Sequence, residues 1–366
     1  MQYKNAAMRI KGRGVRGLKF VVKNISNDYQ ITNYDYDLPE EMIAQEPAAQ
    51  RDESRLMICE RESGSVSHTT FSAITEHLNA GDLLVFNNTR VMKARVRCRR
   101  RTGGKVELLF LHPLKNGWRA IGKPFARLKS GETIVTENGC SIEITEKHVG
   151  GNLTVQVPDM DAVELMECEG CTPLPPYIKR DSKKFDCSRY QTVYAAEHGS
   201  AAAPTAGLHF TEALIRRLSE AGVETCYTTL HVGIGTFKPV QSEDIRNHRM
   251  HAEFYRITEK AAAQIQRALK EKRRIVAVGT TSMRVLESAC SGSDVAAGKG
   301  WTDLYITPDY TFKAVSALIT NFHLPRTSLL ILVSAFAGRK FILDCYQQAI
   351  EQGYRFYSYG DAMFVS

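Results

Sequence analysis

Three histidines share one local setting, and their chemistry makes them the first candidates for a functional site. His209 lies in GLHF, His231 in TLHV and His323 in NFHL, so each imidazole stands between two apolar neighbours. In a strand or at a strand end, those neighbours face one side and the imidazole the other, which holds the ring rigidly. Imidazole titrates nearer neutral pH than other side chains. We interpret all three as candidate acid or base residues. The alternative is three histidines at the edge of the core, bonded to backbone carbonyls.

Small and turn-forming residues surround these histidines. The stretch AAAPTAGLHFT, from Ala201, carries no charge. A loop of Ala, Gly and Pro lets the backbone approach a ligand closely. Loops that follow rigid strands are also where α/β proteins place their binding sites. We therefore predict substrate contacts at Thr205, Gly207, Gly233, Gly235 and Asn321.

The segment VGTTSMR, from Val278, has the composition of an anion site. An apolar strand runs into Gly279, Thr280 and Thr281, and the helix expected to follow contains Arg284. Free backbone N–H groups at a helix N-terminus favour an anion, and hydroxyls with an arginine would add to that. We predict that these four residues bind a carboxylate or phosphate. An ordinary strand-to-helix turn with capping hydroxyls is the alternative.

Further polar residues follow expected strands or turns. Asn88 and Arg90, in FNNTR, can hydrogen-bond a ribose or a base edge, although Asn is also a common turn residue. Asp361, in YSYGDAMFV, lies among aromatic residues, where a carboxylate can have a raised pKa and act as acid or base; it can equally be a structural cap. HRMHAEFY has metal-like histidine spacing, yet it also fits a surface segment entering a strand.

The elements that must position these residues follow from apolar periodicity. TEALIRRLSEAG places Leu214, Ile215 and Leu218 on one helix face, with Thr211 as N-cap and Gly222 as the stop. A short helix is expected near Ser72 to Asn79. RRIVAVGTTS reads as a buried strand, and LLILVSAFAG and FILDCYQQAIEQG as helices. Helices and strands therefore alternate on either side of a central region.

That central region has a different pattern. From about Arg95 to Pro158, segments such as KVELLFL and SIEIT alternate apolar and polar residues, with Gly-containing turns between them. Short strands at this spacing indicate a small β-barrel. We predict a barrel-like mixed α/β main domain from residues 31–94 and 160–366, with a β-barrel domain inserted at 95–159.

The net charge of +8 for 366 residues is concentrated at the N-terminus. Residues 1–30 carry seven basic side chains and one acidic, which leaves +2 for the rest of the chain. We interpret 1–30 as a basic extension that need not be ordered. GRGVRG within it matches GxGxxG but lacks the strand and helix that a dinucleotide site requires. Basic clusters at Arg95, Lys179 and Lys270 raise the odds of RNA contact only modestly.

The cysteines and apolar runs bear on the compartment. Nine scattered cysteines are more typical of a reducing cytosol than of a disulfide framework, and we see neither a secretory signal nor a run long enough to span a bilayer. We expect a cytoplasmic protein without a membrane partner, with a monomer favoured. The pair Cys168 and Cys171 has CxxC spacing, and Cys187 and His198 could complete a zinc site. A single such pair is a weak signal.

From the residues alone, two readings compete for an α/β enzyme. His209, His231 and His323 could form a His₃ metal site for a hydrolase. Alternatively, a metal-free cleft lined by His, Gly and hydroxyl groups could bind a ribose-bearing substrate and an RNA. A third class, an RNA-binding module without catalysis, would instead show exposed aromatic platforms and basic stripes.

Several of these stretches, in order, resemble one family. They are similar to segments of the S-adenosylmethionine:tRNA ribosyltransferase-isomerases of the queuosine pathway. The similar stretches are YDLPEEMIAQEP, FNNTRVMKARV, APTAGLHFT, TLHVGIGTFKPV, AVGTTSMRVLES, LITNFHLPRTSLLILVSAFAG and YRFYSYGDAMFV. The resemblance covers the chain from about Tyr34 to its end. It implies an α/β fold with an inserted β-barrel, and substrates that are S-adenosylmethionine and tRNA. It implies no cofactor beyond S-adenosylmethionine as co-substrate, and no metal.

The reaction that the resemblance implies suggests roles for the candidates. The ribosyl part of S-adenosylmethionine passes to 7-aminomethyl-7-deazaguanine at the wobble position of tRNA, giving epoxyqueuosine, adenine and methionine. We assign acid–base work to His209 and His231, with His323 third, and contact with the primary amine to Asp361. Gly279, Thr280, Thr281 and Arg284 would anchor the methionine carboxylate. Asn88 and Arg90 would contact ribose or RNA. These roles follow from residue chemistry and not from the family.

Overall fold

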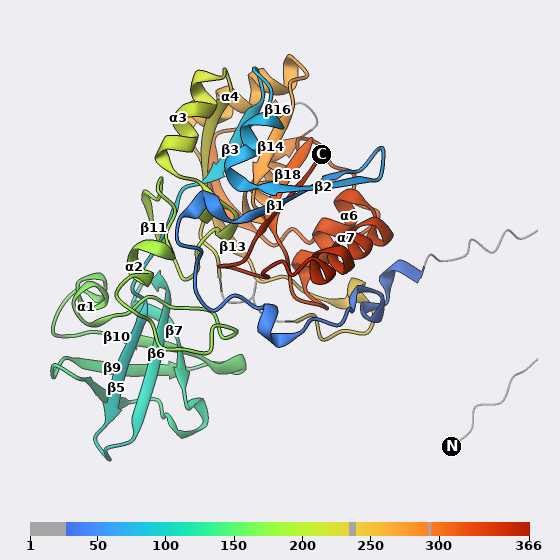
Figure 1. The fold of residues 1–366 in the computed structure, drawn as a ribbon. Helices are drawn as coiled ribbons and strands as arrows, with labels where there is room; N and C mark the ends of the chain where they lie inside the picture. The colour runs from blue at the N-terminus through green and yellow to red at the C-terminus, as the bar shows by residue number, and fades with distance from the viewer. Residues whose placement is uncertain (1–26, 234–238, 292–293) are drawn as a thin grey trace, which may run out of the picture.

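A computed structural model describes residues 27–233, 239–291 and 294–366 of the chain (Figure 1). Most of the predicted basic extension, 1–30, and the predicted substrate contact Gly235 lie outside the described residues. The described chain forms two bodies: a helix-covered sheet and a smaller barrel (Figure 1).

A nine-stranded mixed sheet forms the main domain, in the order β17-β13-β12-β3-β14-β18-β19-β1-β2. Its strands are β1 Arg55–Glu60, β2 Ser65–Thr70, β3 Leu83–Asn87, β12 Glu224–Leu230, β13 Glu253–Ile257, β14 Ile275–Val278, β17 Gly298–Thr302, β18 Ala317–Asn321 and β19 Ala362–Val365. The four central strands β12, β3, β14 and β18 are mutually parallel. Their carboxyl ends therefore meet at one edge of the sheet, where α/β proteins place their sites.

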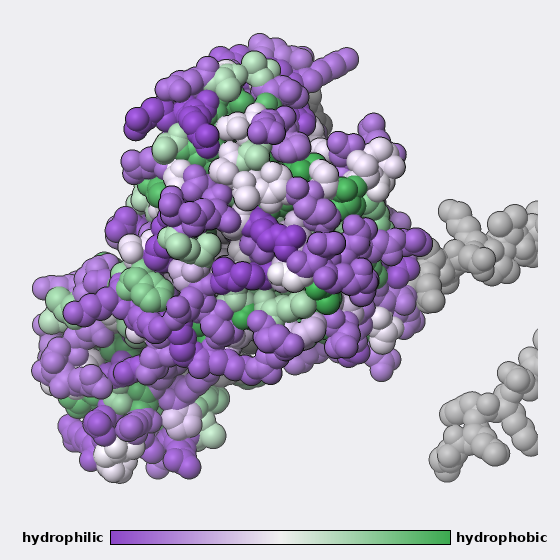
Figure 2. All heavy atoms as spheres, viewed as in Figure 1, coloured by the Kyte–Doolittle hydropathy of each residue, from purple (hydrophilic) through white to green (hydrophobic). Residues whose placement is uncertain are grey.

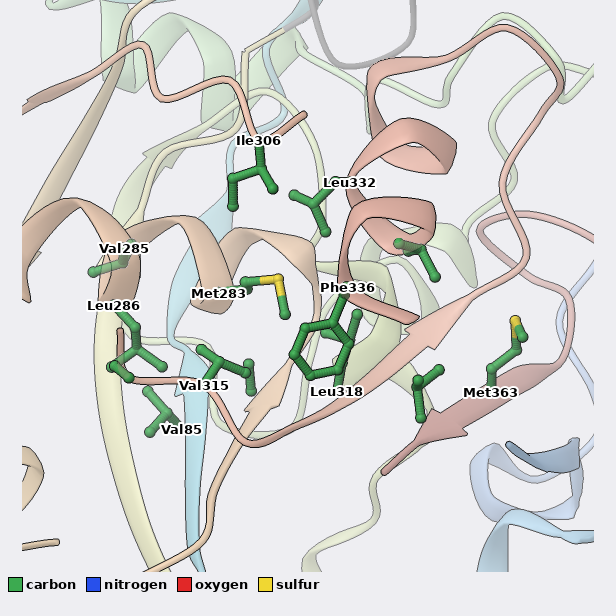
Figure 3. Close-up of a cluster of buried hydrophobic side chains, with 14 of the residues drawn as sticks. Val85, Met283, Val285, Leu286, Ile306, Val315, Leu318, Leu332, Phe336 and Met363 are labelled. Atoms are coloured by element: carbon green, nitrogen blue, oxygen red, sulfur yellow. The ribbon is translucent and has the colours of Figure 1, made fainter. Parts of the chain in front are cut away.

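Both faces of this sheet are buried, which explains why β3 and β14 are almost wholly apolar, whereas β12 carries Glu224 and three threonines. Successive residues of β3 enter different clusters: Leu83 and Val85 pack on one face, Leu84 and Phe86 on the other. The helices are α3 Glu212–Glu220, α4 Glu259–Lys270, α5 Thr280–Ala289, α6 Ser328–Ala337 and α7 Arg339–Glu351. Figure 3 shows Met283 and Leu286 of α5 with Phe336 of α6 in the larger cluster. The layers thus hold the strand ends rigidly.

The helix signals in the sequence are confirmed for α3. The Thr211 hydroxyl accepts the backbone N–H of Leu214 at 3.1 Å, and Gly222 follows the helix in the left-handed region, at φ 84°. The helix expected near Ser72 to Asn79 is instead a 3₁₀ helix, Phe71–Glu76. Its buried residues, Phe71 and Ile74, are three apart, which is the spacing that places side chains one above another in a 3₁₀ helix.

The inserted domain is a closed six-stranded barrel in the order β10-β7-β6-β5-β8-β9 (Figure 1). Its strands are β5 Arg95–Arg100, β6 Lys105–Leu114, β7 Gly117–Lys123, β8 Glu132–Thr136, β9 Ser141–Lys147 and β10 Asn152–Gln156. The predicted mixed α/β fold with an inserted β-barrel is confirmed. Helix α1, Ala162–Glu169, places Leu165 and Met166 in the barrel's apolar cluster. Packing of this body therefore extends past residue 159.

Short elements lie near the junction of the two bodies. They are β4 Thr89–Val91, which pairs with β11 Glu197–Ser200, and helix α2 Asp186–Arg189. The pair β15 Cys290–Ser291 and β16 Asp294–Val295 belongs to the main domain, where β16 lies beside α4 (Figure 1). The face of the molecule in Figure 2 is mostly hydrophilic, with small separate apolar patches. Within the described ranges, no helix is long and apolar enough to cross a membrane.

Candidate active site

A cleft of about 760 Å³ lies between the barrel and the main sheet. Its walls come from both bodies. The barrel contributes Leu111, His112, Pro113, Arg119, Ile121, His148, Val149, Gly150 and Asn152, and the main domain His198, Gly199, Ala201, His231, Val232, Gly233, His251, Ala252, Glu253, Phe254 and Trp301. Five of the ten histidines in the chain therefore line one cavity. A cavity of this size holds a nucleoside-sized ligand.

His231 is the one predicted catalytic histidine that lines the cleft. It directly follows β12, and its ring stacks on Phe254 with centroids 5.4 Å apart. Nδ1 lies 2.8 Å from the Thr89 hydroxyl, while Nε2 has no hydrogen-bond partner among the described residues. Burial lowers the pKa of this imidazole below its usual 6.5, so the ring is neutral at pH 7. In the tautomer whose Nδ1–H donates to the Thr89 hydroxyl, the ring can accept a proton at Nε2.

Gly199 makes room for this ring, and sequence reasoning missed it. A Cβ at this position would lie 2.6 Å from Nε2 of His231, closer than real Cβ contacts allow. Its φ of 143° is also one that glycine adopts most readily. The pattern EHGS gave no signal for this, because the contact joins β11 to the end of β12, 32 residues along the chain.

A second cavity, of about 40 Å³, lies at the carboxyl ends of β14 and β18 and shares Val232 with the cleft. The predicted contacts Thr205, Gly279, Thr280, Thr281, Asn321 and His323 all line it. Three of its lining side chains have buried polar atoms with no hydrogen-bond partner among the described residues: Thr281 Oγ1, Asn321 Oδ1 and Tyr357 Oη. Buried polar atoms are usually paired, so these three indicate a place for a polar ligand group.

His209 has a different environment from the one predicted. It ends a 3₁₀ helix, Thr205–His209, and stacks on Phe71. Nδ1 lies 2.7 Å from the Ser54 hydroxyl and Nε2 lies 3.0 Å from the amide nitrogen of Asn321. Since an amide nitrogen only donates, Nε2 must accept and Nδ1 carries the proton. If Nε2 were protonated, its N–H would face the N–H of the Asn321 amide, and two donors cannot form a hydrogen bond. This geometry argues against an acid–base role for His209.

This network gives His209 a positioning role. The same Asn321 amide nitrogen also lies 3.3 Å from the carbonyl oxygen of Asp361, to which it donates. Both bonds fix the amide with its nitrogen away from the small cavity, so that Oδ1 is left as the free acceptor. Burial, followed by the positive charges of Arg51 and Arg355, lowers the pKa of His209 to about 3.

His323 lines the small cavity but is also closed in by its neighbours. Its Nε2 lies 2.9 Å from the Thr320 hydroxyl, and its backbone N–H donates to the Tyr346 hydroxyl at 2.9 Å. Burial lowers its pKa to about 3. This ring is therefore neutral at pH 7.

Arg284 does not reach the anion site that was predicted for it. It is 3% exposed, forms an ion pair with Glu253 on β13 and donates to the carbonyl oxygen of Leu304 at 3.1 Å. The other oxygen of Glu253 accepts the backbone N–H of Gly233 at 2.7 Å. Arg284 therefore supports the cleft wall from behind, and its guanidinium is not available to the anion site predicted at Gly279, Thr280 and Thr281.

The remaining predicted residues lie away from both cavities. Asp361 is 2% exposed, and its two carboxylate oxygens accept the backbone N–H groups of Arg55 and Arg355, at 2.9 and 2.8 Å. Burial raises its pKa, with these backbone bonds opposing the shift. Asn88 accepts from the Thr229 hydroxyl at 2.7 Å. These contacts are structural, and neither residue lines the cleft or the small cavity.

Arg90 is exposed on β4 and lines neither cavity, so its predicted contact with RNA stays a prediction. The environment of Gly207 differs from the one predicted. Gly207 faces Tyr194: a Cβ there would lie 2.0 Å from the Tyr194 hydroxyl oxygen. The close approach that this glycine permits is therefore to the protein's own aromatic ring, because Tyr194 fills the space expected for a ligand.

The metal alternatives find no support in the geometry. His231 lines the large cleft, His323 the small cavity, and His209 a third pocket with Arg51 and Ser54, so the three do not converge on one point. Across the described residues there is no group of three or more His, Cys, Asp or Glu placed to hold an ion. This includes the Cys168 and Cys171 pair, which are free thiols. The His₃ hydrolase reading therefore fails on ligand placement.

The predicted basic clusters are largely paired with acids in the folded protein. The ion pairs are Arg95–Glu107, Arg97–Asp181, Arg100–Glu132, Lys179–Glu40, Arg180–Asp186, Lys183–Glu46, Arg273–Glu224, Arg273–Glu271 and Arg274–Asp82. The exposed pairs, such as Lys179–Glu40, contribute little to stability, whereas the carboxylates of Asp186 and Asp82 are buried. All of these pairs reduce the positive field of their clusters.

Stability is expected to fall in weak acid because His209 and His323 are held neutral. In the unfolded chain each imidazole takes up a proton near pH 6.5, whereas in the folded protein each has a pKa of about 3 and stays unprotonated until that pH. The free energy of unfolding should therefore drop by about 1.4 kcal/mol per histidine between pH 7.5 and 5.5. Urea titrations at both pH values measure this. His209→Gln and His323→Asn should each flatten the dependence, and equal wild-type stability at the two pH values would contradict the assignment.

The fold and the site together define a class: a two-domain α/β enzyme whose cleft lies between an inserted barrel and the carboxyl ends of parallel strands. The model of the family described as queuosine biosynthesis protein matches residues 31–365, and the chain belongs to that family. It is an enzyme of queuosine biosynthesis, of the S-adenosylmethionine:tRNA ribosyltransferase-isomerase type.

Individual relatives agree with this assignment. The chain is 50% identical over 335 residues to the S-adenosylmethionine:tRNA ribosyltransferase-isomerase of Caldanaerobacter subterraneus subsp. tengcongensis, covering 90% of this chain and 98% of that one. It is 47% identical over 342 residues to the enzyme of the same name from Heliobacterium modesticaldum, covering 92% and 99%. The crystal structure of S-adenosylmethionine tRNA ribosyltransferase from Thermotoga maritima is similar, with 35% identity and a TM-score of 0.54 over 91% of this chain and 100% of that one.

Proposed function

We propose that this enzyme transfers and isomerises the ribosyl part of S-adenosylmethionine onto 7-aminomethyl-7-deazaguanine at the wobble position of tRNA. The products are epoxyqueuosine-tRNA, adenine and methionine. Membership of the family and the names of its relatives support the substrates. The observation that carries the chemistry is His231, a neutral imidazole in an interdomain cleft with a free Nε2.

The reaction needs a base, a proton donor and an anchor for methionine. The sulfonium acidifies the C5′ protons of the ribose, a base removes one, and adenine leaves from C1′ with a proton. The amine of the modified base then adds to the sugar, and epoxide closure breaks the bond to sulfur and releases methionine. We assign the removal of the C5′ proton to Nε2 of His231. Thr89 holds the other ring nitrogen and so sets the direction of the ring.

We place the amino acid end of S-adenosylmethionine in the small cavity. The backbone N–H groups at the start of α5 and the free Thr281 hydroxyl suit a carboxylate, and Oδ1 of Asn321 suits an ammonium group. The Tyr357 hydroxyl is a further donor there. Because Val232 lines both cavities, the sulfonium and ribose would then point toward the cleft that holds His231.

The reaction itself is tested by supplying S-adenosylmethionine and a tRNA that carries 7-aminomethyl-7-deazaguanine. We expect equal amounts of adenine and methionine, and an epoxide-bearing nucleoside in digested tRNA. A control tRNA with unmodified guanine should give none of these products. Methylated tRNA with S-adenosylhomocysteine, or both substrates bound without adenine release, would overturn the proposal.

Thr281→Val is expected to weaken S-adenosylmethionine binding. The change removes one hydroxyl donor to a carboxylate while keeping the shape, which costs about 1.5–3 kcal/mol, or roughly 10- to 150-fold in Kd. Calorimetric titration with S-adenosylmethionine measures it. Ser282→Ala is the matched control on the same helix, because that hydroxyl donates to the carbonyl oxygen of Val278 at 2.9 Å. Equal affinity in the two variants would place the carboxylate elsewhere.

A further inference from the structure

We propose that Trp301 is a stacking platform for an unpaired nucleobase of the RNA substrate, at the rim of the interdomain cleft. The inference rests on the proposed function, since it assumes that an RNA enters the cleft. It adds a residue and a contact that the reaction chemistry does not require.

Trp301 is the exposed aromatic platform of the cleft. It lies on the edge strand β17 and is 59% exposed, whereas nearly all other large apolar side chains of the described chain are buried or half-buried. Phe254 and His112 hold it by edge-to-face contacts, each with ring centroids 5.9 Å apart. Phe254 comes from the neighbouring strand and His112 from the barrel. The indole is thus fixed in direction by both bodies while much of its surface stays free.

The rest of the cleft suits a nucleic acid strand. Val149, at 97% exposure, adds an apolar contact from the barrel side. Arg119 on β7 also lines the cleft and has no ion-pair partner within the described ranges. Among the described residues that line the cleft, Glu253 is the one acidic side chain, and Arg284 neutralises it. An aromatic surface beside an unpaired cation is the combination that binds single-stranded nucleic acid, through stacking and phosphate contact.

An RNA base fits this platform better than the adenine of S-adenosylmethionine does. The atoms that suit the amino acid end line the small cavity, whose shared wall with the cleft is Val232. Trp301 instead lies at an exposed sheet edge beside the barrel, where a macromolecule can reach it. Both sources offer a nucleobase, so the experiment must separate them.

The contact can be observed directly because the chain has only two tryptophans, Trp118 and Trp301. In a Trp118→Phe enzyme, all tryptophan fluorescence comes from Trp301. An RNA hairpin with an unpaired anticodon loop should quench this signal, while S-adenosylmethionine alone and a loop-free RNA duplex should not. Quenching by S-adenosylmethionine alone would assign the platform to adenine. Filter retention shows independently whether the hairpin is bound. If the bound hairpin does not quench the fluorescence of Trp301, the proposal is overturned.

Affinity measurements give a second test. Trp301→Ala should weaken hairpin binding by about 5- to 150-fold, while Trp301→Phe keeps most of the affinity. S-adenosylmethionine affinity should be unchanged in both. Phe185→Ala is the matched control, since Phe185 is also exposed, at 36%, and lies outside the cleft. Equal hairpin affinity for Trp301→Ala and wild type would refute the platform, even if the wild-type enzyme releases adenine. If adenine is not released but the hairpin still quenches Trp301, the proposed reaction is refuted while the stacking platform stands.

Discussion

Replacing His231 by alanine is expected to lower the rate of adenine release by about 10²- to 10⁴-fold, the contribution typical of a general acid or base. The imidazole of His231 is neutral and has a free Nε2 in the cleft. Its Nδ1 is hydrogen-bonded to Thr89, and the missing side chain of Gly199 leaves space for the ring. Single-turnover adenine release, at saturating S-adenosylmethionine and modified tRNA, measures the loss. Substrate affinity should change little, because the role is confined to proton transfer.

The pH profile separates this role from a structural one. Burial lowers the pKa of His231 below 6.5, so the base form dominates at pH 7 and is lost as the pH falls through the folded pKa. The wild-type rate should therefore fall on the acid side, and His231→Ala should lack that limb. His251→Ala is the matched control, because His251 lines the same cleft but is exposed. Wild-type release by His231→Ala, or equal losses in both variants, would rule out the assignment.

Replacing Arg284 by alanine is expected to lower the free energy of unfolding by about 3–5 kcal/mol. The variant leaves the Glu253 carboxylate, 4% exposed, without the guanidinium that neutralises it. It also frees the carbonyl oxygen of Leu304 from its donor. Guanidinium chloride unfolding, followed by circular dichroism, measures the change.

A second ion pair, formed by a residue of β13, the strand that also carries Glu253, provides the control. Arg256 pairs with Glu197 at 3.4 Å, but both side chains are more than two-fifths exposed, so Arg256→Ala should cost less than about 1 kcal/mol. An Arg284→Ala protein of normal stability that no longer binds S-adenosylmethionine would instead restore the carboxylate-anchor role predicted from sequence.

Local signals in the sequence were sufficient to predict the helices and strands, and the edge of the main sheet at which the site lies. The Thr211 cap and the Gly222 stop depend only on nearby residues, so they could be read directly. Apolar alternation predicted the barrel because each strand buries one face. The strands that lead into His231 and Gly279, β12 and the apolar β14, are each parallel to β3, so their carboxyl ends share one edge.

Only the tertiary structure could sort the candidate residues at that edge. All three histidines have apolar neighbours on both sides in sequence, yet one faces the cleft, one bonds to Asn321, and one bonds to Thr320 and Tyr346. Likewise, no local pattern tells Arg284 to pair with a carboxylate 31 residues away instead of a ligand. A side chain's identity gives its possible chemistry. Its pKa and its free atoms are set by burial and by partners that folding brings from distant segments.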